Sequence, residues 1–245
     1  MRALPLSLCA LFAVGFFPAG RQQEPPPSLP DTILWAWAAK QDLRFLKPED
    51  KTGIAFLDRT VVLHPQGVRV RPRLQPFLYT PGVPLIAVVR MESTRSGMPP
   101  VKDAARAAAA AATNGSALQI DFDALLSERR WYRDFLRELR SHTDVPLLIT
   151  ALESWCEERR GDWFRSLPIR EATPMLFRMG SEESRLPLDF PNAAVCDTSA
   201  GVSTDEMPAR LPRNARRIYI FHPGSWTPQA YAQAMRQLQG LRKMQ

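Results

Sequence analysis

The chain is poor in the residues that build metal sites. Its 245 residues include three histidines and three cysteines. His64, His142 and His222 stand far apart with no H-x3-H pair, and no cysteine belongs to a CxxC pair. These absences count against a metal-dependent polysaccharide deacetylase and against a zinc site. We therefore expect no metal and no cofactor.

Other motifs are missing as well. The absence of G-x-S-x-G counts against a serine hydrolase. The absence of a Gly-rich phosphate loop counts against a nucleotide-sugar transferase, although a D-x-D pattern that could hold a metal is present. The net charge is +7, but the basic residues are spread among acids and form no nucleic-acid motif. We expect a solvated Arg-rich surface and no nucleic-acid partner, with attraction to anionic envelope polymers or lipid as the second interpretation.

A run long enough to span a membrane is also lacking, because such a helix needs roughly 20 apolar residues. The apolar run from Leu6 to Phe17 is shorter, follows one arginine and precedes small residues. This pattern predicts a signal peptide over residues 1–20 and a periplasmic or secreted protein. Phe17 and Pro18 stand where a small residue is usual before cleavage, so an uncleaved anchor in the inner membrane is the alternative.

The polar, Pro-rich stretch "RQQEPPPSLP" predicts a linker over residues 21–30, which leaves 31–245 as one domain. Export would leave Cys156 and Cys196 in the mature chain. An oxidising compartment permits one disulfide between them, and two separate buried thiols are the alternative.

Short apolar runs recur along the domain, each the length of a buried strand. Eight candidate strands result: "TILWAW", "GIAFLDRTVVL", "PLIAVVRME", "ALQIDFDA", "VPLLITAL", "ATPMLFRM", "NAAVCDTS" and "RRIYIFHP". Helical patterns lie between several of them or follow them: "VKDAARAAAAAAT", "SERRWYRDFLRELRSH" and "TPQAYAQAMRQLQ". In the last of these, Thr227 is the expected cap and Pro228 lies in the first turn.

Alternating strands and helices predict an α/β fold with a parallel sheet. Eight strands favour a compact, TIM-like (β/α)8 barrel, with an open doubly wound sheet as the alternative. The barrel should be irregular around the second strand, because "VVLHPQGVRVRPRL" reads as a hairpin instead of a helix.

The fourth strand, "LQIDFDA", ends in two carboxylates. Gln119, Asp121 and Asp123 share one face of this strand, and the intervening residues, all apolar, share the other. A buried charge is costly unless it is paired or used, so the polar face should line the barrel and meet solvent at its carboxyl-terminal mouth.

Polar and aromatic residues gather at the other strand ends too. We predict catalytic roles for Asp121, Asp123 and Glu92, and substrate-binding roles for Trp35, Trp37, Arg90, Glu153, Trp155, Arg178, Asp197 and His222. Two carboxylates that flank a glycosidic bond can act as acid and as base or nucleophile, and tryptophans offer flat faces to sugar rings. The structural alternatives are core tryptophans, a structural Arg90–Glu92 pair, and an Asp121 that only holds a loop.

The strand "QIDFDA" resembles the acidic strand of chitinase-like barrels, whose pattern is D-x-x-D-x-D-x-E. Asp121 and Asp123 match the second and third acids, whereas Leu118 and Leu125 replace the first acid and the catalytic glutamate. This departure removes that family's proton donor.

A longer resemblance runs through "TILWAW", "RVRPRLQP", "LIAVVRME", "LQIDFDA", "ITALESWC", "PMLFRMG" and "FHPGSW". On these stretches the chain resembles an uncharacterised bacterial family known as domain of unknown function 3142. The resemblance implies a glycosidase-like barrel that acts on an envelope or extracellular glycan. A non-catalytic barrel that binds a glycan or cell-wall polymer is the alternative, and the missing glutamate at position 125 favours it.

Overall fold

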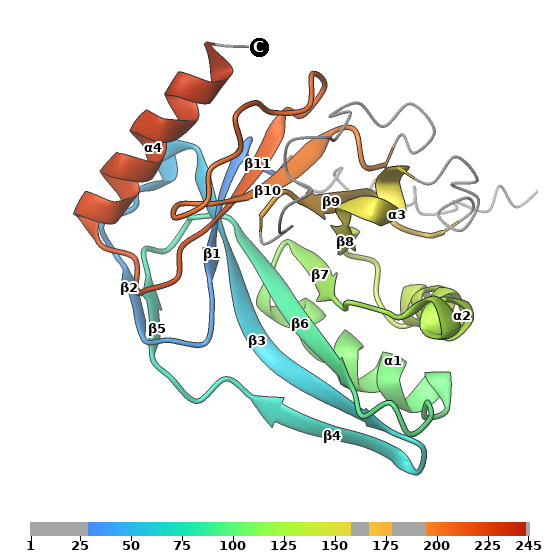
Figure 1. The fold of residues 1–245 in the computed structure, drawn as a ribbon. Helices are drawn as coiled ribbons and strands as arrows, with labels where there is room; N and C mark the ends of the chain where they lie inside the picture. Colours follow the sequence, from blue (N-terminus) through green and yellow to red (C-terminus); the bar gives the residue numbers. More distant parts are fainter. Residues whose placement is uncertain (1–28, 158–166, 178–194, 244–245) are drawn as a thin grey trace, which may run out of the picture.

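The computed structural model describes residues 29–157, 167–177 and 195–243 (Figure 1). Parallel strands close into a barrel in the order β1-β11-β10-β9-β8-β7-β6-β3, since β1 pairs with both β11 and β3. The predicted TIM-like barrel is confirmed. The barrel strands are β1 (Thr32–Ala36), β3 (Thr52–His64), β6 (Leu85–Ser93), β7 (Ala117–Asp121), β8 (Leu147–Leu152), β9 (Glu171–Met175), β10 (Ser199–Ser203) and β11 (Arg217–Phe221).

Alternation along the strands divides the core into two clusters. Leu118 and Ile120 of β7 point outward into the larger cluster, which lies between the barrel and its helices. The inner cluster fills the lumen and includes Ile33, Trp35 and Tyr219. The predicted orientation of β7 is therefore confirmed, because the polar Gln119 lies between the two outward residues and bonds to Trp35 inside the lumen.

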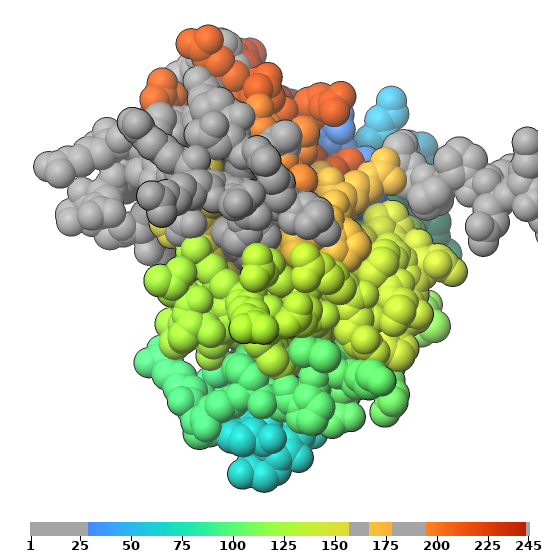
Figure 2. All heavy atoms as spheres, turned by 90° about the vertical axis from the view of Figure 1, so that its right-hand side faces the viewer, coloured from blue at the N-terminus to red at the C-terminus, as the bar shows by residue number. Residues whose placement is uncertain are grey.

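Helices cover the outside of the barrel. They are α1 (Val101–Ala109), α2 (Arg129–Arg140), the short α3 (Glu153–Glu157) and α4 (Pro228–Arg242), with 3-10 turns at Pro48–Asp50, Ala112–Asn114 and Leu126–Glu128. Figure 2 shows α1 and α2 as successive layers on one face of the molecule. The predicted cap of α4 is present, because Thr227 Oγ1 accepts a 3.1 Å hydrogen bond from the Ala230 N–H. Within the described ranges, no helix is long and apolar enough to cross a membrane.

The second barrel strand is irregular, as predicted. β3 continues beyond the barrel and pairs antiparallel with β4 (Gly67–Pro72), so the predicted hairpin stands where a helix usually follows a barrel strand (Figure 1). The register of β3 against β6 shifts between Leu57 and Arg59. Such a shift bends a strand, and here it falls where β3 begins to pair with β4. A separate parallel pair is formed by β2 (Gln41–Leu43) and β5 (Phe77–Tyr79).

The seventh strand lies further along the chain than predicted. The sequence favoured residues 192–199, of which 192–194 fall outside the described residues, whereas β10 is Ser199–Ser203. Its sequence "SAGVS" lacks a run of large apolar residues. A Cβ added at Gly201 would lie 2.9 Å from the Met175 sulfur, so a larger residue here would displace the Met175 side chain of β9.

A buried ionic cluster closes the amino-terminal end of the barrel. Arg217 forms an ion pair with Glu171, and the Tyr219 hydroxyl donates a 2.7 Å hydrogen bond to the same carboxylate. Arg217 also donates to the backbone carbonyls of Leu29 and Pro30, at 3.0 and 2.9 Å. The chain is thus held to the closed end of the barrel immediately before β1.

Cys156 of α3 and Cys196 form a disulfide, with their Cα atoms 6.0 Å apart. Of the two alternatives left by the sequence, the structure has the bonded one. Both cysteines are buried in the outer cluster, and the bond joins α3 to the segment before β10.

Candidate functional site

A cavity of about 470 Å³ opens at the carboxyl-terminal mouth of the barrel. Five of the residues predicted for the site meet there, contributed by the ends of β1, β6 and β7 and the residues that follow them. The lining consists of Trp35, Trp37, Arg90, Asp121, Asp123, Leu152, Met175, Phe177 and Phe221. The position matches the end of the barrel where enzymes of this fold carry their sites.

Asp121 is held from both sides. Arg90, its register partner on β6, donates a 2.8 Å hydrogen bond to Oδ2, and Thr150 of β8 donates a 3.0 Å bond to Oδ1. The residue is 8% exposed. Burial raises the pKa of this carboxyl above its usual value, although Arg90 and Thr150 act in the opposite direction.

Asp123 stands in a different environment, two residues beyond Asp121 and past the end of β7. Its side chain is exposed and lines the cavity. Among residues 29–157, 167–177 and 195–243, it has no hydrogen-bond or ion-pair partner within contact distance. Its negative charge raises the pKa of the neighbouring Asp121. The mouth therefore carries one buried, bonded carboxyl group and one that is accessible to a ligand.

Arg90 joins the carboxylates to an aromatic wall. Its guanidinium carbon lies 5.6 Å from the centre of the Trp37 ring, a cation–π arrangement. Burial lowers the pKa of Arg90, but the hydrogen bond to Asp121 and the attraction of Asp121, Asp123 and Glu92 together outweigh this effect, and the pKa is raised overall. Arg90 is therefore a permanent cation between Trp37 and Asp121.

The two predicted tryptophans of β1 have different surroundings. Trp35 is buried, donates from Nε1 to Gln119 Oε1 at 3.2 Å and packs against Tyr219 with ring centres 5.7 Å apart. It forms the floor of the cavity. Trp37 lies past the end of β1, is half-buried and presents part of its ring at the mouth.

Glu92 lies beside the mouth cavity and not within it. It forms an ion pair with Arg71 of β4, and Arg90 Nε lies 3.6 Å from its Oε1. Glu92 lines a neighbouring hollow that also contacts Asp123. The contacts of Glu92 therefore match the structural alternative, in which Glu92 pairs with Arg90, although Arg71 is the nearer partner.

Two residues that follow β8 do not line the cavity. Trp155 is 2% exposed and packs in the outer cluster, with its ring centre 6.5 Å from that of Tyr132 and the Arg129 guanidinium over it. Glu153 is the buried first residue of α3. The strand ends at Leu152, and the turn into α3 carries the residues beyond it away from the mouth. The expectation that Trp155 presents a ring face to a ligand is corrected by this burial.

Two further predicted residues also lie elsewhere. Asp197 precedes β10 and accepts a hydrogen bond from Asn214, so it lies at the amino-terminal end of that strand, opposite the mouth. This correction follows directly from the shifted seventh strand. His222 follows β11, bonds to Thr204 Oγ1 at 2.7 Å and packs on Trp226, outside the cavity lining. Arg178 lies outside the described residues.

One side of the mouth cavity is apolar and was not predicted from the sequence. Phe177 and Phe221 stack with ring centres 5.6 Å apart, and Leu152 and Met175 complete the lining. Alternation could have found two of them, because Phe221 lies two residues after the inward Tyr219 and Leu152 lies two after the inward Thr150.

Arg73 was also missed. Its guanidinium donates hydrogen bonds to the backbone carbonyls of Ala36, Trp37 and Ala39, and it lies 5.5 Å from the centre of the Phe77 ring. One side chain thereby fixes the turn that carries Trp37. Burial lowers the pKa of this guanidinium, but arginine stays charged at any ordinary pH.

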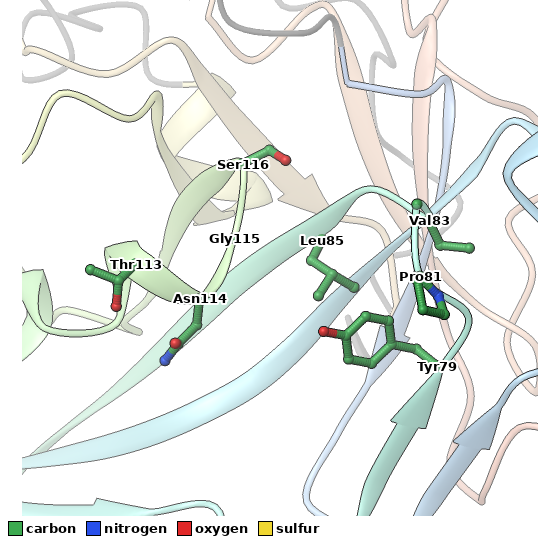
Figure 3. Close-up of a pocket in the computed structure, with 9 residues that line it drawn as sticks. Tyr79, Pro81, Val83, Leu85, Thr113, Asn114, Gly115 and Ser116 are labelled. Atoms are coloured by element: carbon green, nitrogen blue, oxygen red, sulfur yellow. The ribbon is translucent and has the colours of Figure 1, made fainter.

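A second hollow, of about 490 Å³, lies where β6 and β7 begin, near the opposite end of the barrel (Figure 3). It is lined by Tyr79, Pro81, Gly82, Val83, Leu85, Thr113, Asn114, Gly115 and Ser116. Among the described residues that line it there is no carboxylate, arginine or histidine, so they offer no counterpart to the charged groups at the mouth.

The described ranges contain no group of three or more histidine, cysteine or acidic side chains that could hold a metal ion. No family model, curated protein or solved structure matches the chain. The mouth geometry is therefore the basis for a functional proposal.

Proposed function

We propose that the protein is a carbohydrate-active, glycoside hydrolase-like enzyme that binds a glycan at the mouth of its barrel. One observation carries this proposal: a single cavity combines Asp121, Asp123 and the partly exposed Trp37 ring. Glycoside chemistry uses two carboxyl groups in different protonation states, and aromatic faces bind the C–H side of sugar rings.

The environments of the two aspartates suggest separate roles. Burial raises the pKa of Asp121, which extends its protonated form to higher pH and suits a proton donor. Asp123 is exposed in the cavity and suits the base or nucleophile. Arg90 contacts both Asp121 and Trp37 and fixes the position of the Asp121 side chain.

We also propose that the protein is exported and that its substrate is an envelope or extracellular glycan. The Cys156–Cys196 disulfide supports this placement, since such bonds persist mainly in oxidising compartments. An inner-membrane tether upstream of Leu29 is the alternative to a cleaved signal.

A non-catalytic glycan-binding barrel is the second candidate. Two observations favour it: both oxygens of Asp121 already accept hydrogen bonds, and Leu125, 45% exposed, stands where chitinase-like barrels carry their catalytic glutamate. This candidate keeps the Trp37 platform but assigns no chemistry to Asp123.

The test combines a glycan-binding screen with a reducing-end assay on wild-type protein and two variants. In Asp123→Asn, turnover should fall by roughly 100-fold or more while binding is kept, because only the titrating group is lost. Asp103→Asn, the same change at an exposed position of α1, should leave turnover unchanged. Trp37→Ala should weaken binding.

Each result has a clear meaning. Cleavage that survives in Asp123→Asn would end the catalytic assignment of this residue. Binding without cleavage by the wild type would establish the second candidate. A wild-type protein that neither binds nor cleaves any glycan would overturn both.

A further inference from the structure

A smaller hollow adjoins the mouth cavity. Its volume is about 210 Å³, and it lies between the end of β6 and the segment that follows β7. Arg90 and Asp123 line both spaces, so the two hollows are neighbours with these residues between them. A glycan chain whose reacting bond lies over Asp123 would place one sugar in each space.

Two of the carboxylates in this hollow already have a partner. Glu92 is paired with Arg71 and Arg90. Glu128 Oε2 accepts a 2.9 Å hydrogen bond from the Leu125 N–H at the start of a 3-10 turn. Among the described residues that line the hollow, the charged side chains without a hydrogen-bond or ion-pair partner are Asp123 and Arg95.

The side chain of Arg95 is exposed at the rim of the hollow. Among the residues that the structure describes, it has no ion-pair or hydrogen-bond partner. A guanidinium without a counter-ion at the rim of a ligand space is available to bind an anionic group on the ligand.

The backbone around Arg95 is held in place. Arg95 adopts a left-handed conformation with φ of 60°, and its N–H donates a 3.0 Å hydrogen bond to Ser93 Oγ. The preceding Thr94 donates from Oγ1 to the Leu63 carbonyl of β3 at 3.0 Å. These bonds fix the turn to the barrel wall and reduce the ordering cost of binding.

We propose that this hollow is a second sugar subsite and that Arg95 recognises a carboxylate on the sugar it holds. The inference rests on the proposed glycan function and specifies its substrate class: a chain that contains acidic sugars. A uronic acid and a lactyl-bearing amino sugar both present such a carboxylate, which a guanidinium binds through two parallel N–H donors.

The experiment measures binding of matched chains with free or methyl-esterified carboxylates. One arm uses oligogalacturonides, and the other uses peptide-free strands of alternating N-acetylglucosamine and N-acetylmuramic acid. For one of the two, wild-type protein should bind the free acid about tenfold or more tightly than the ester. Arg95→Gln should abolish this preference without weakening ester binding. Arg95→Lys should keep part of it, since the charge remains but the planar fork is lost.

Arg69→Gln is the matched control, because Arg69 is an exposed arginine of β4 outside this hollow. It removes the same charge and should keep the preference for the free acid. A similar loss in both variants would indicate general charge attraction and overturn the subsite.

The remaining outcomes separate this inference from the proposed function. Equal affinity for acid and ester, or binding confined to neutral glycans, would overturn the acidic subsite and leave the glycan site standing. If no glycan of any kind binds, the proposed function fails and the subsite fails with it.

Discussion

The Arg90 guanidinium on β6 donates a 2.8 Å hydrogen bond to the Asp121 carboxylate directly opposite it on β7. This pair connects the cation–π contact with Trp37 to the hydrogen bond from Thr150. Arg90 and Asp121 are therefore positioned by three neighbouring strands, β6, β7 and β8, whereas Asp123 lies past the end of β7.

The pH dependence of stability follows from the burial of Asp121. Burial raises its folded pKa, so the folded protein holds this proton more tightly than the unfolded chain, whose value is about 3.9. The stabilising contribution is complete below that pH and is lost as pH rises through the folded pKa. We expect the free energy of unfolding of wild type, relative to Asp121→Asn, to decrease from about pH 4 upward.

Urea unfolding at stepped pH measures this difference. Thr150→Val provides a second variant, because it removes a hydrogen bond that holds the pKa of Asp121 down. In this variant, the decrease in the free energy of unfolding should extend to higher pH, because the folded pKa of Asp121 is higher. If the free energy of unfolding of wild type relative to Asp121→Asn stays constant or increases with pH, the pKa of Asp121 is not raised in the folded protein.

Arg73 should control the order of the turn that carries Trp37. Arg73→Gln removes the hydrogen bonds to Ala36, Trp37 and Ala39, so amide hydrogen exchange in residues 37–40 should accelerate. The expected loss of stability is about 1–3 kcal/mol. Arg73→Lys should not restore protection, since an ammonium group cannot reproduce the planar fork. Unchanged exchange in both variants would show that the turn is ordered without Arg73.

Tyr219→Phe should separate stability from function. The substitution removes a buried 2.7 Å hydrogen bond to Glu171 at the closed end of the barrel and should cost about 1–3 kcal/mol in urea unfolding. Because burial and Glu171 raise the pKa of Tyr219 well above its usual value, this cost should be independent of pH between about 6 and 8. Glycan affinity at the mouth should stay at the wild-type value, and a marked fall would mean that the two ends of the barrel are coupled.

The disulfide should make a large contribution to stability. Cys156 and Cys196 are 40 residues apart, and the chain-entropy relation for such a loop gives about 4 kcal/mol. The midpoint of urea unfolding should therefore fall when a reductant is added. The double variant Cys156→Ser, Cys196→Ser should have a low midpoint that no longer responds to the reductant.

The sequence predicted the barrel because buried parallel strands read as apolar runs, and seven of the eight runs overlap a strand of the structure over most of that strand's length. Alternation also oriented Asp121 correctly, since a charged residue between two outward apolar neighbours has to face the lumen. The exception was β10, whose sequence "SAGVS" contains no run of large apolar residues to detect.

The residues that were wrongly predicted to line the site lie where the alternating pattern of a strand ends. Asp197 was misplaced because β10 begins two residues later, and Trp155 because the chain turns into α3 immediately after β8. Arg73 could not be found from strand patterns, since it acts through backbone carbonyls of a distant turn. Its role depends on the tertiary fold.

The anchoring of Leu29 and Pro30 by Arg217 fixes where the described chain enters the barrel. Leu29 packs against the inner cluster at the closed end, opposite the mouth. If the apolar amino-terminal run stays in a membrane, the domain is tethered by its closed end, and the mouth lies at the end of the barrel remote from the point of attachment. A tether at that end leaves the mouth open to polymers of the envelope.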